Sequence, residues 1–173
     1  SAEDALSRIT RPIKLECPVW SSNDYESCIY NDDINNLIDT LPEDIDIMYI
    51  DPPYNQHPYS SNYFMLNLII ENKMPTKISK VSGIPSDWQR SNFNYKNKAI
   101  ESMKHLLDKG LQKSKFILLS YNNEGIIEPS DWDKLFEPYK VTKKEINYDT
   151  YKGSRNLQNR SNKVIEIMYI ISK

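Results

Sequence analysis

The run Asp51-Pro52-Pro53-Tyr54 is the part of the sequence whose residue types and spacing most clearly suggest a catalytic role. It directly follows residues 45–50, an apolar stretch that predicts a strand buried in a parallel sheet. In open α/β sheets, ligands bind at the carboxyl ends of the strands, which is where these four residues would lie. The two prolines stiffen the turn because proline fixes φ, and the first leaves its carbonyl free beside the Asp51 carboxylate. The sequence therefore predicts a rigid pair of hydrogen-bond acceptors with an aromatic lid, suited to a flat substrate that carries an NH₂ group.

Asp-Pro-Pro-Tyr after an apolar strand resembles the signature of the AdoMet-dependent DNA methyltransferases that modify N6 of adenine, the D12-like enzymes of the DPPY class. Related families that methylate cytosine N4 usually carry Ser at the first position, and protein-glutamine and many RNA methylases carry Asn, so Asp favours adenine in DNA. The resemblance implies a site-specific methyltransferase of the restriction-modification type, with AdoMet as its cofactor. Its catalytic residues would be Asp51, Pro52, Pro53 and Tyr54.

The chemistry implied by the resemblance concerns an amino group that is a poor nucleophile, because its lone pair is delocalised into the ring. The Asp51 carboxylate and the Pro52 carbonyl would each accept one N–H and draw the nitrogen toward a tetrahedral shape. Tyr54 would stack on an adenine that has been swung out of double-stranded DNA. Positioning would then supply most of the rate.

The bulk properties are those of an ordinary globular protein of one domain, with 173 residues, 39% hydrophobic and 27% charged. No apolar run approaches the ~18 residues of a membrane span, and we expect no membrane partner. Cys17 and Cys28 are isolated and only two histidines are present, so we expect no metal site and a reducing cytoplasm.

The net charge of −2 conceals a strong asymmetry along the chain. Residues 1–72 hold 3 basic and 13 acidic side chains, whereas residues 73–115 hold 10 basic and 3 acidic ones. Residues 116–173 are nearly balanced, with 9 basic and 8 acidic side chains. This distribution suits a protein that holds a cationic cofactor at one place and a polyanion at another. A solvated, lysine-rich helix face explains the basic segment equally well.

The elements before the Asp51 run predict a compact strand–helix–strand unit. Residues 27–30 are a short strand candidate, and Pro42 would end the helix that follows it. A right-handed crossover would lay this strand parallel to the strand at 45–50. The helix is predicted from one apolar stripe at helical spacing, formed by Ile34, Leu37, Ile38 and Leu41.

Asp32 and Asp33 would then lie just past the carboxyl end of the first strand, facing the same crevice as Asp51. In the resembling family, an acid in an Asn-x-Asp arrangement contacts the adenine or ribose of AdoMet, and Asp33 of Asn31-Asp32-Asp33 holds that position. The alternative is a helix N-cap, because Asp is favoured there. The sequence leaves both roles open.

The segment after the Asp51 run is polar and aromatic from residue 55 to residue 63, and a helix is predicted over residues 64–70. Family members often carry a Tyr-x-x-x-Tyr run behind the signature. Asn55, Tyr59 and Tyr63 are therefore candidate contacts to the substrate or DNA. Simple packing is the alternative for the two tyrosines.

Residues 73–94 form a loop too long to be a mere connection, and we expect it to contact DNA. Lys80 and Arg90 are the candidate contacts, since basic groups interleaved with aromatic ones suit phosphates and unstacked bases. A surface loop anchored by Trp88 is the alternative.

The remaining elements complete a predicted sheet. An amphipathic helix is expected over residues 95–109 with Gly110 as its C-cap, followed by a strand at 115–120. The exit of that strand, Ser120-Tyr-Asn-Asn-Glu-Gly125, is similar to a run in the same methylase class. A short helix with Ser130 as its N-cap is expected over residues 129–136.

Residues 139–151 and 163–172 predict two strands in an antiparallel terminal hairpin, which the resemblance makes a hallmark of the class I methyltransferase sheet. Lys152 and Arg155 in the connection could grip phosphates near the flipped base. A disordered tip is the alternative.

The predicted fold class is α/β, a partial Rossmann-like class I methyltransferase sheet with a C-terminal antiparallel β-hairpin. Residues 1–24 would be a linker or the end of an upstream element, and residues 25–173 a portion of the catalytic domain.

The sequence departs from the family in lacking a glycine-rich loop for AdoMet. Its four glycines are at least 15 residues apart. The chain would be an excised piece of a longer enzyme, one half of a split enzyme whose partner subunit carries that loop, or a relic without turnover. We favour the first, in which a missing N-terminal portion holds the loop. A non-catalytic nucleic-acid-binding or assembly subunit of a split methyltransferase, using the basic segment 73–115, is the alternative function.

Overall fold

The computed structural model describes residues 10, 12, 14, 16–20, 22, 24–81, 83–87, 89–149 and 163–173. The chain divides into two units, Ser1–Asn31 and Asp32–Lys173. In the described part of the first unit no helix or strand forms, so the strand predicted at 27–30 is wrong. Ile29 is 95% exposed there, and a strand without a hydrogen-bonded neighbour is not stable. The predicted strand–helix–strand unit therefore does not form.

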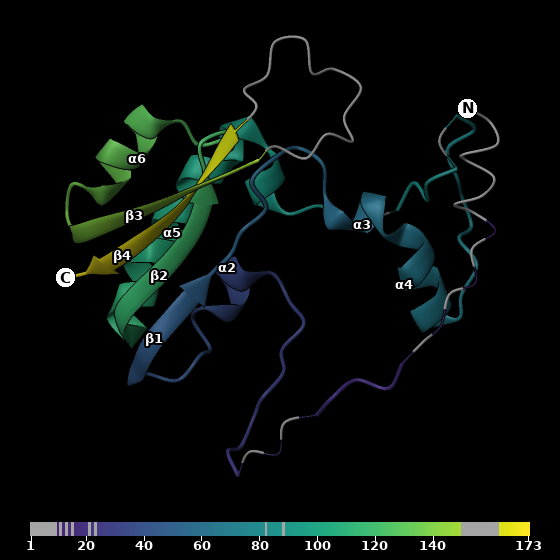
Figure 1. The fold of residues 1–173 in the computed structure, drawn as a ribbon, viewed down its shortest axis with the longest axis horizontal. Coiled ribbons are helices and arrows are strands. Elements are labelled where there is room, and N and C mark those ends of the chain that lie inside the picture. The colour runs from purple at the N-terminus through teal and green to yellow at the C-terminus, as the bar shows by residue number, and fades with distance from the viewer. Residues whose placement is uncertain are drawn as a thin grey trace. The chain divides into compact units, whose positions relative to one another are not determined.

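Four strands build one mixed sheet in the second unit, in the order β1-β2-β4-β3 (Figure 1). β1 (Ile45–Ile50) and β2 (Ser114–Asn122) are parallel, with Ile50 opposite Leu119. β3 (Lys140–Asp149) and β4 (Lys163–Ser172) pair antiparallel, and β4 also pairs antiparallel with β2. The strand at 45–50 is confirmed at its predicted residues, and the other three lie close to theirs. The connection between β3 and β4 lies outside the described residues.

β1 lies at the edge of the sheet, which corrects the prediction that it is buried. Side chains alternate along a strand, so Met48 and Ile50 face the core while Ile47 and Tyr49 face the other way. Ile47 and Tyr49 are each 58% exposed, and Phe116 of β2, opposite Ile47, is also exposed. No described helix covers this face, because α5 and α6 contribute their buried residues to the core on the opposite face.

Helix α5 (Lys96–Lys113) packs against β2 and supplies much of the core. The prediction that Gly110 ends this helix is wrong, because the helix continues for three residues beyond it and ends at Ser114 as C-cap. Gly110 is needed for close approach instead. A Cβ at this position would lie 2.9 Å from Ile117 Cδ1 and 3.2 Å from Met48 Sδ.

The helix predicted over residues 129–136 is confirmed at those residues, whereas the helix predicted from the stripe at 34–41 is shorter than expected. α2 (Ile34–Leu37) is only four residues long, although its apolar stripe continues through the following turn to fully buried Ile38. α6 (Pro129–Phe136) starts with proline at its first turn, so Glu128 is its N-cap and the prediction of Ser130 is wrong. A short 3₁₀ helix, η1 (Asn92–Asn94), precedes α5.

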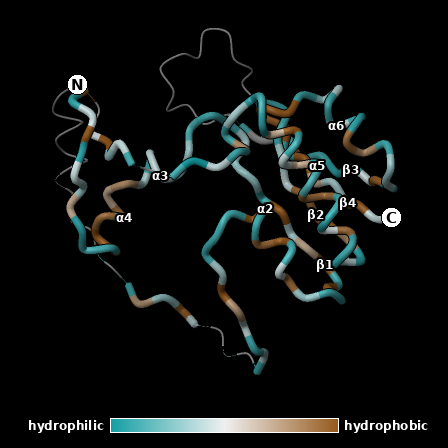
Figure 2. Tube along the Cα trace, turned by 180° about the vertical axis from the view of Figure 1, so that it is seen from behind, coloured by the Kyte–Doolittle hydropathy of each residue, from teal (hydrophilic) through white to brown (hydrophobic). Residues whose placement is uncertain are grey.

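Helices α3 (Tyr59–Asn62) and α4 (Phe64–Glu71) follow the Asp51 run. α4 confirms the helix predicted at 64–70, but none of its residues is buried. Figure 2 shows hydrophobic stretches along α4 as well as in the sheet. A helix that is apolar all round normally lies in an interior. No helix in the described part of the chain is long and apolar enough to cross a membrane.

We predict that Gly110→Val lowers the free energy of unfolding by about 1–3 kcal/mol, because the added methyl groups overpack the contact between α5 and the sheet. Urea unfolding followed by circular dichroism measures this loss. The matched control is Gln112→Val, which introduces the same residue at an exposed position of the same helix. Equal stability of the two variants would contradict the close approach at Gly110.

Candidate active site

The pairing of β1 with β2 brings Asp51 beside Ser120, since each residue follows one member of the pair Ile50 and Leu119. Tyr54 lies three residues further along, and its Oη donates a hydrogen bond to Asp51 Oδ1 at 2.6 Å. The same Tyr54 Oη lies 2.9 Å from Ser120 Oγ. Two parallel strands thus meet at one hydrogen-bonded corner at their carboxyl ends.

The corner presents two acceptors that have no partner in the part of the chain that the structure describes. Asp51 is exposed, and its second oxygen, Oδ2, accepts no hydrogen bond from a described residue. Pro52 is buried, and no described residue donates to its carbonyl. The carboxylate is therefore accessible, and the corner is not sealed inside the core.

Tyr54 is held at both its ends. Its ring meets the ring of Tyr121 in a T-shaped contact with 5.0 Å between centroids, and its carbonyl accepts from Ile126 N at 2.8 Å. Burial, together with the hydrogen bond to Asp51, raises the pKa of the Tyr54 hydroxyl well above its usual range. The hydroxyl is thus a neutral donor at physiological pH.

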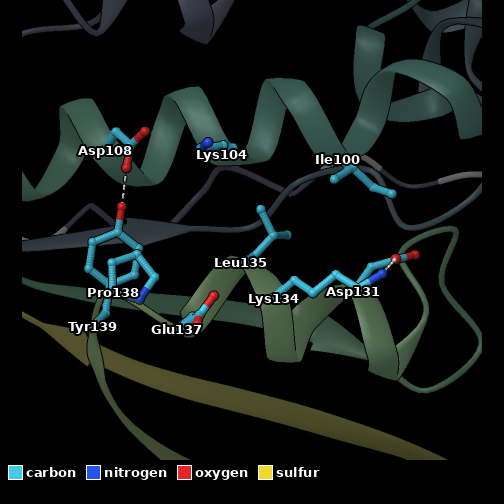
Figure 3. Close-up of a pocket in the computed structure, with 9 residues that line it drawn as sticks. All are labelled: Ile100, Lys104, Asp108, Asp131, Lys134, Leu135, Glu137, Pro138 and Tyr139. Atoms are coloured by element: carbon cyan, nitrogen blue, oxygen red, sulfur yellow. Dashed lines mark hydrogen bonds and ion pairs between the residues drawn. The ribbon is translucent and has the colours of Figure 1, made fainter.

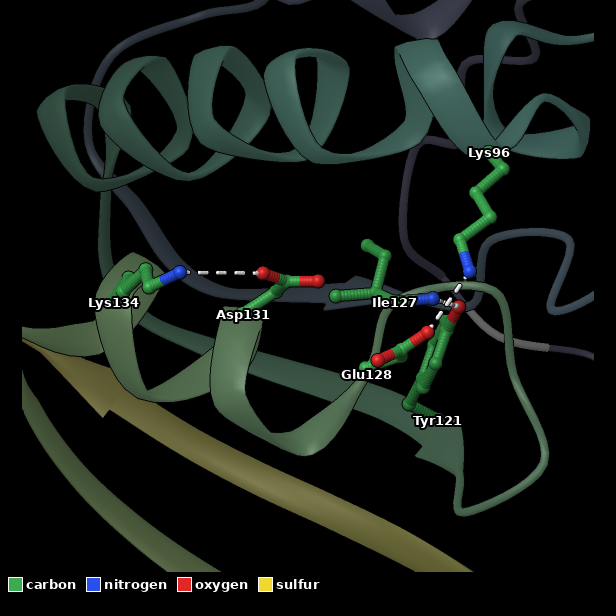
Figure 4. A network of polar contacts seen from close by, with 6 residues as sticks. All are labelled: Lys96, Tyr121, Ile127, Glu128, Asp131 and Lys134. Atoms are coloured by element: carbon green, nitrogen blue, oxygen red, sulfur yellow. Dashed lines mark hydrogen bonds and ion pairs between the residues drawn. The ribbon is translucent and has the colours of Figure 1, made fainter.

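The loop after β2 holds Tyr121, the aromatic partner of Tyr54, through a network of polar contacts (Figure 4). Ile127 N donates to Tyr121 Oη at 3.0 Å, and Lys96 pairs with Glu128 at 2.9 Å across to α5. The hydrogen bond from Lys96 holds the pKa of the Glu128 carboxyl below its usual range. Gly125 lies so close to the Tyr121 ring that any Cβ there would overlap it. The loop therefore fixes Tyr121, and through it the ring of Tyr54.

Asp33 adopts the N-cap role that the sequence left open, because its Oδ1 accepts from Asn35 N at 2.9 Å. Asp32 Oδ1 accepts from Asp33 N at 2.7 Å. Both aspartates are exposed, and α2 lies beside the carboxyl end of β1 (Figure 1). The acidic groups thus lie toward the same end of the sheet as Asp51.

The structure brings Asn55 and Arg90 together around the loop that follows the corner. Asn94 Nδ2 donates to the Asn55 carbonyl at 2.7 Å, and Arg90 Nη2 donates to the Gln56 carbonyl at 2.8 Å. The Arg90 guanidinium also lies 4.3 Å from the centroid of the Tyr95 ring. Segments 55–56 and 90–95 therefore form one structure next to the site.

The other predicted contacts do not converge on the corner. Tyr59 and Tyr63 stack on each other with 5.8 Å between ring centroids and are 69% and 52% exposed. Lys80 is exposed beside the isolated bridge between Ile78 and Pro85. Lys152 and Arg155 lie outside the described residues.

Ser120, Tyr121 and Asn94 contact the candidate site residues, and the sequence alone predicted no role for them. Ser120 and Tyr121 lie at the carboxyl end of a parallel strand, and that position was a usable signal. Asn94 gave no such signal, because only the folded chain brings it to Asn55. It is buried, and its Oδ1 has no hydrogen-bond partner within the described residues.

A hollow of about 310 Å³ lies between α5 and α6 (Figure 3). Tyr139 donates a hydrogen bond to Asp108 at one end of it, and Lys134 pairs with Asp131 at the other. Its charges are mixed, and none of its lining residues belongs to the Asp51 corner. The candidate site is therefore the corner itself.

The mixed sheet and its helices define an α/β protein, and the exposed Asp51 carboxylate at the carboxyl end of a parallel strand lies where ligands bind in such folds. Residues 20–135 match the family model of the D12 class N6 adenine-specific DNA methyltransferases. The chain therefore belongs to the D12 class N6 adenine-specific DNA methyltransferase family.

Curated relatives carry consistent names. The chain is 33% identical to modification methylase StsI of Streptococcus sanguinis over 159 residues, which are 87% of this chain and 23% of that protein. It is 29% identical to type II methyltransferase M.NlaIII of Neisseria lactamica over 167 residues, 94% of this chain and 48% of that protein. It is 31% identical to type II methyltransferase M.FokI of Planomicrobium okeanokoites over 164 residues, which are 91% of this chain and 24% of that protein. The chain thus spans about half the length of one relative and about a quarter of the other two.

We predict that the wild type loses more free energy of unfolding above about pH 10 than Tyr54→Phe does. The folded state raises the Tyr54 pKa, so its contribution is fully present below the unfolded pKa of about 10 and is lost as the pH rises through the folded value. Urea unfolding at about pH 9 and about pH 11 measures the difference. Tyr49→Phe, at an exposed position, is the control and should follow the wild type. Identical losses in wild type and Tyr54→Phe would contradict the raised pKa of the half-buried Tyr54 hydroxyl.

Proposed function

We propose that this chain is the carboxyl-terminal portion of the catalytic domain of a site-specific DNA methyltransferase that transfers a methyl group from AdoMet to adenine N6. The observation that carries the proposal is the pair of acceptors at Asp51 and Pro52, which no described residue occupies, in a member of the D12 family. The names of the relatives as modification and type II methyltransferases support a restriction-modification role.

The chain's own residues would act by orienting the adenine amino group. Asp51 Oδ2 and the Pro52 carbonyl each accept one N–H, which reduces delocalisation of the nitrogen lone pair into the ring. Because both acceptors are fixed where positive charge develops, they stabilise the transition state more than the ground state. The Tyr54 ring, with its hydroxyl and carbonyl tied down, offers a fixed platform for stacking of the flipped base.

The residues present fit one part of a site for AdoMet. When bound, AdoMet supplies an electrophilic methyl group on a positively charged sulfonium. Exposed Asp32 and Asp33, with Asp51, give that end of the sheet a negative charge that suits a cation. One oxygen of Asp33 caps α2, so the other is the one proposed to contact the adenine or ribose of the cofactor.

Several groups beyond the corner are proposed to hold the DNA. The Arg90 guanidinium, fixed by the Gln56 carbonyl and the Tyr95 ring, would contact a phosphate next to the flipped base. Exposed Tyr59 and Tyr63 offer stacking surfaces close in sequence to the corner. Asn55, Lys80, Lys152 and Arg155 remain proposed contacts from the sequence.

The missing part of the enzyme is proposed to dock on β1. The strand is an edge, and its bare face carries exposed Ile47, Tyr49 and Phe116. Parallel strands are normally covered on both faces, and half or more of each relative's length lies outside the aligned part. A further parallel strand and its helices would complete a Rossmann-like class I sheet and would carry the glycine-rich loop that this sequence lacks.

We predict that Asp51→Ala lowers methyl transfer by the complete methyltransferase about 10²-fold or more, with DNA binding retained. Mass spectrometry of nucleosides after incubation with DNA and AdoMet measures N6-methyladenine, and fluorescence anisotropy measures DNA binding. The matched control is Asp46→Ala, an exposed aspartate of β1 that pairs with Lys115 at 2.6 Å. Unchanged transfer by Asp51→Ala would favour the non-catalytic nucleic-acid-binding subunit instead.

We also predict that the isolated chain binds AdoMet weakly or not at all, because the glycine-rich loop lies outside it. Isothermal titration calorimetry of the chain alone checks this. A Kd on the order of micromolar or lower would show that these residues make the cofactor site by themselves. Asp33→Asn in the complete methyltransferase tests the proposed contact, because an amide oxygen retains the helix cap while the charge is lost. We expect the Kd for AdoMet to rise in this variant.

A further inference from the structure

We propose that Ser120 is a positioning residue for the transfer reaction, acting through the Tyr54 hydroxyl to fix the rotation of the Asp51 carboxylate. This inference deepens the proposed function and rests on it. It starts from the hydrogen-bonded chain of Ser120, Tyr54 and Asp51, which joins the ends of two parallel strands.

The direction of the hydrogen bonds follows from counting protons. A tyrosine hydroxyl has one proton to donate, and an ionised carboxylate can only accept. The Tyr54 proton is therefore committed to Asp51 Oδ1 at 2.6 Å. Ser120 Oγ, at 2.9 Å, must then donate to the Tyr54 oxygen. The chain runs from serine through tyrosine to carboxylate, and such chains strengthen each bond by polarisation.

Two members of this hydrogen-bonded chain, Ser120 and Tyr54, are anchored independently of Asp51. Ser120 is part of β2, where it lies opposite Met168 of β4 in the middle of the sheet. The Tyr54 ring packs on Tyr121, whose hydroxyl is itself held by Ile127 N. Asp51, by contrast, is exposed, and Tyr54 is the partner that holds its carboxylate within the described residues. The carboxylate is therefore oriented by the network rather than by packing.

As a consequence, the two oxygens of the Asp51 carboxylate have different roles. Oδ1 is occupied by Tyr54, so Asp51 offers only Oδ2 to the adenine amino group. The Pro52 carbonyl offers the second acceptor, and two N–H groups meet two fixed oxygens. Without Ser120, the Tyr54 hydroxyl loses a hydrogen-bond donor and the Tyr54 ring loses a restraint. The Asp51 carboxylate then samples rotations in which Oδ2 no longer faces the N–H of the adenine amino group. A misplacement of that kind costs rate and leaves cofactor affinity unchanged.

The test compares single-turnover methyl transfer by the complete methyltransferase carrying Ser120→Ala, Tyr54→Phe, or both. We expect Ser120→Ala to lower the single-turnover rate about tenfold or more while the Kd for AdoMet stays unchanged. The double variant should be no slower than Tyr54→Phe alone, because serine acts through tyrosine. Ser120→Thr keeps a hydroxyl and should recover most of the rate.

Ser114→Ala is the matched control, because it removes a serine hydroxyl from the opposite end of β2, where that hydroxyl donates to the Gly110 carbonyl at 2.8 Å. It should lower thermal stability without lowering the rate of the folded enzyme. A wild-type rate for Ser120→Ala, or additive losses in the double variant, would overturn the positioning role. If Asp51→Ala still abolishes transfer in that case, the proposed function stands. Failure of the wild type to form N6-methyladenine would overturn both.

Discussion

The parallel register between β1 and β2 is the constraint on which the site depends. Because Ile50 lies opposite Leu119, the residues that follow them, Asp51 and Ser120, leave the sheet side by side. A slip of one residue would turn Ser120 to the other face and break the link through Tyr54. The core maintains this register. Ile117 and Leu119 point to the face of β2 opposite Ser120, where they are buried on the side that α5 covers.

A continuous run of aromatic rings connects this corner to the centre of the fold. Tyr54 meets Tyr121, Tyr121 meets Trp132 at 4.9 Å, and Trp132 packs on Phe136 and Tyr169. These contacts join the loop after β1 to α6 and β4. Edge-to-face and tilted ring pairs favour particular angles between the rings. The aromatic residues of α6 and β4 therefore help to determine the geometry of the loop after β1. The exposed carboxylate thus rests on a rigid base.

Local patterns in the sequence predicted elements well where the chain itself determines them. The apolar run at 45–50 and the β-branched stretch at 163–172 became strands at those residues. Predictions failed where tertiary packing decides the outcome. Gly110 serves close contact with the sheet instead of a cap, and residues 27–30 have no strand to pair with. The link from Ser120 to Asp51 was likewise beyond local sequence, because 69 positions separate two residues that only strand pairing brings together.

The exposed apolar side chains of α4 have a practical consequence for anyone who produces this chain. Ile69 and Ile70 of this helix are exposed to water, and β1 leaves the sheet with an open hydrogen-bonding edge. The described residues thus present two separate surfaces that favour association. Under the proposed function, the part of the enzyme that docks on β1 would cover this edge, and without it we expect the chain to self-associate at high concentration. Recombinant work would then call for co-expression with that part.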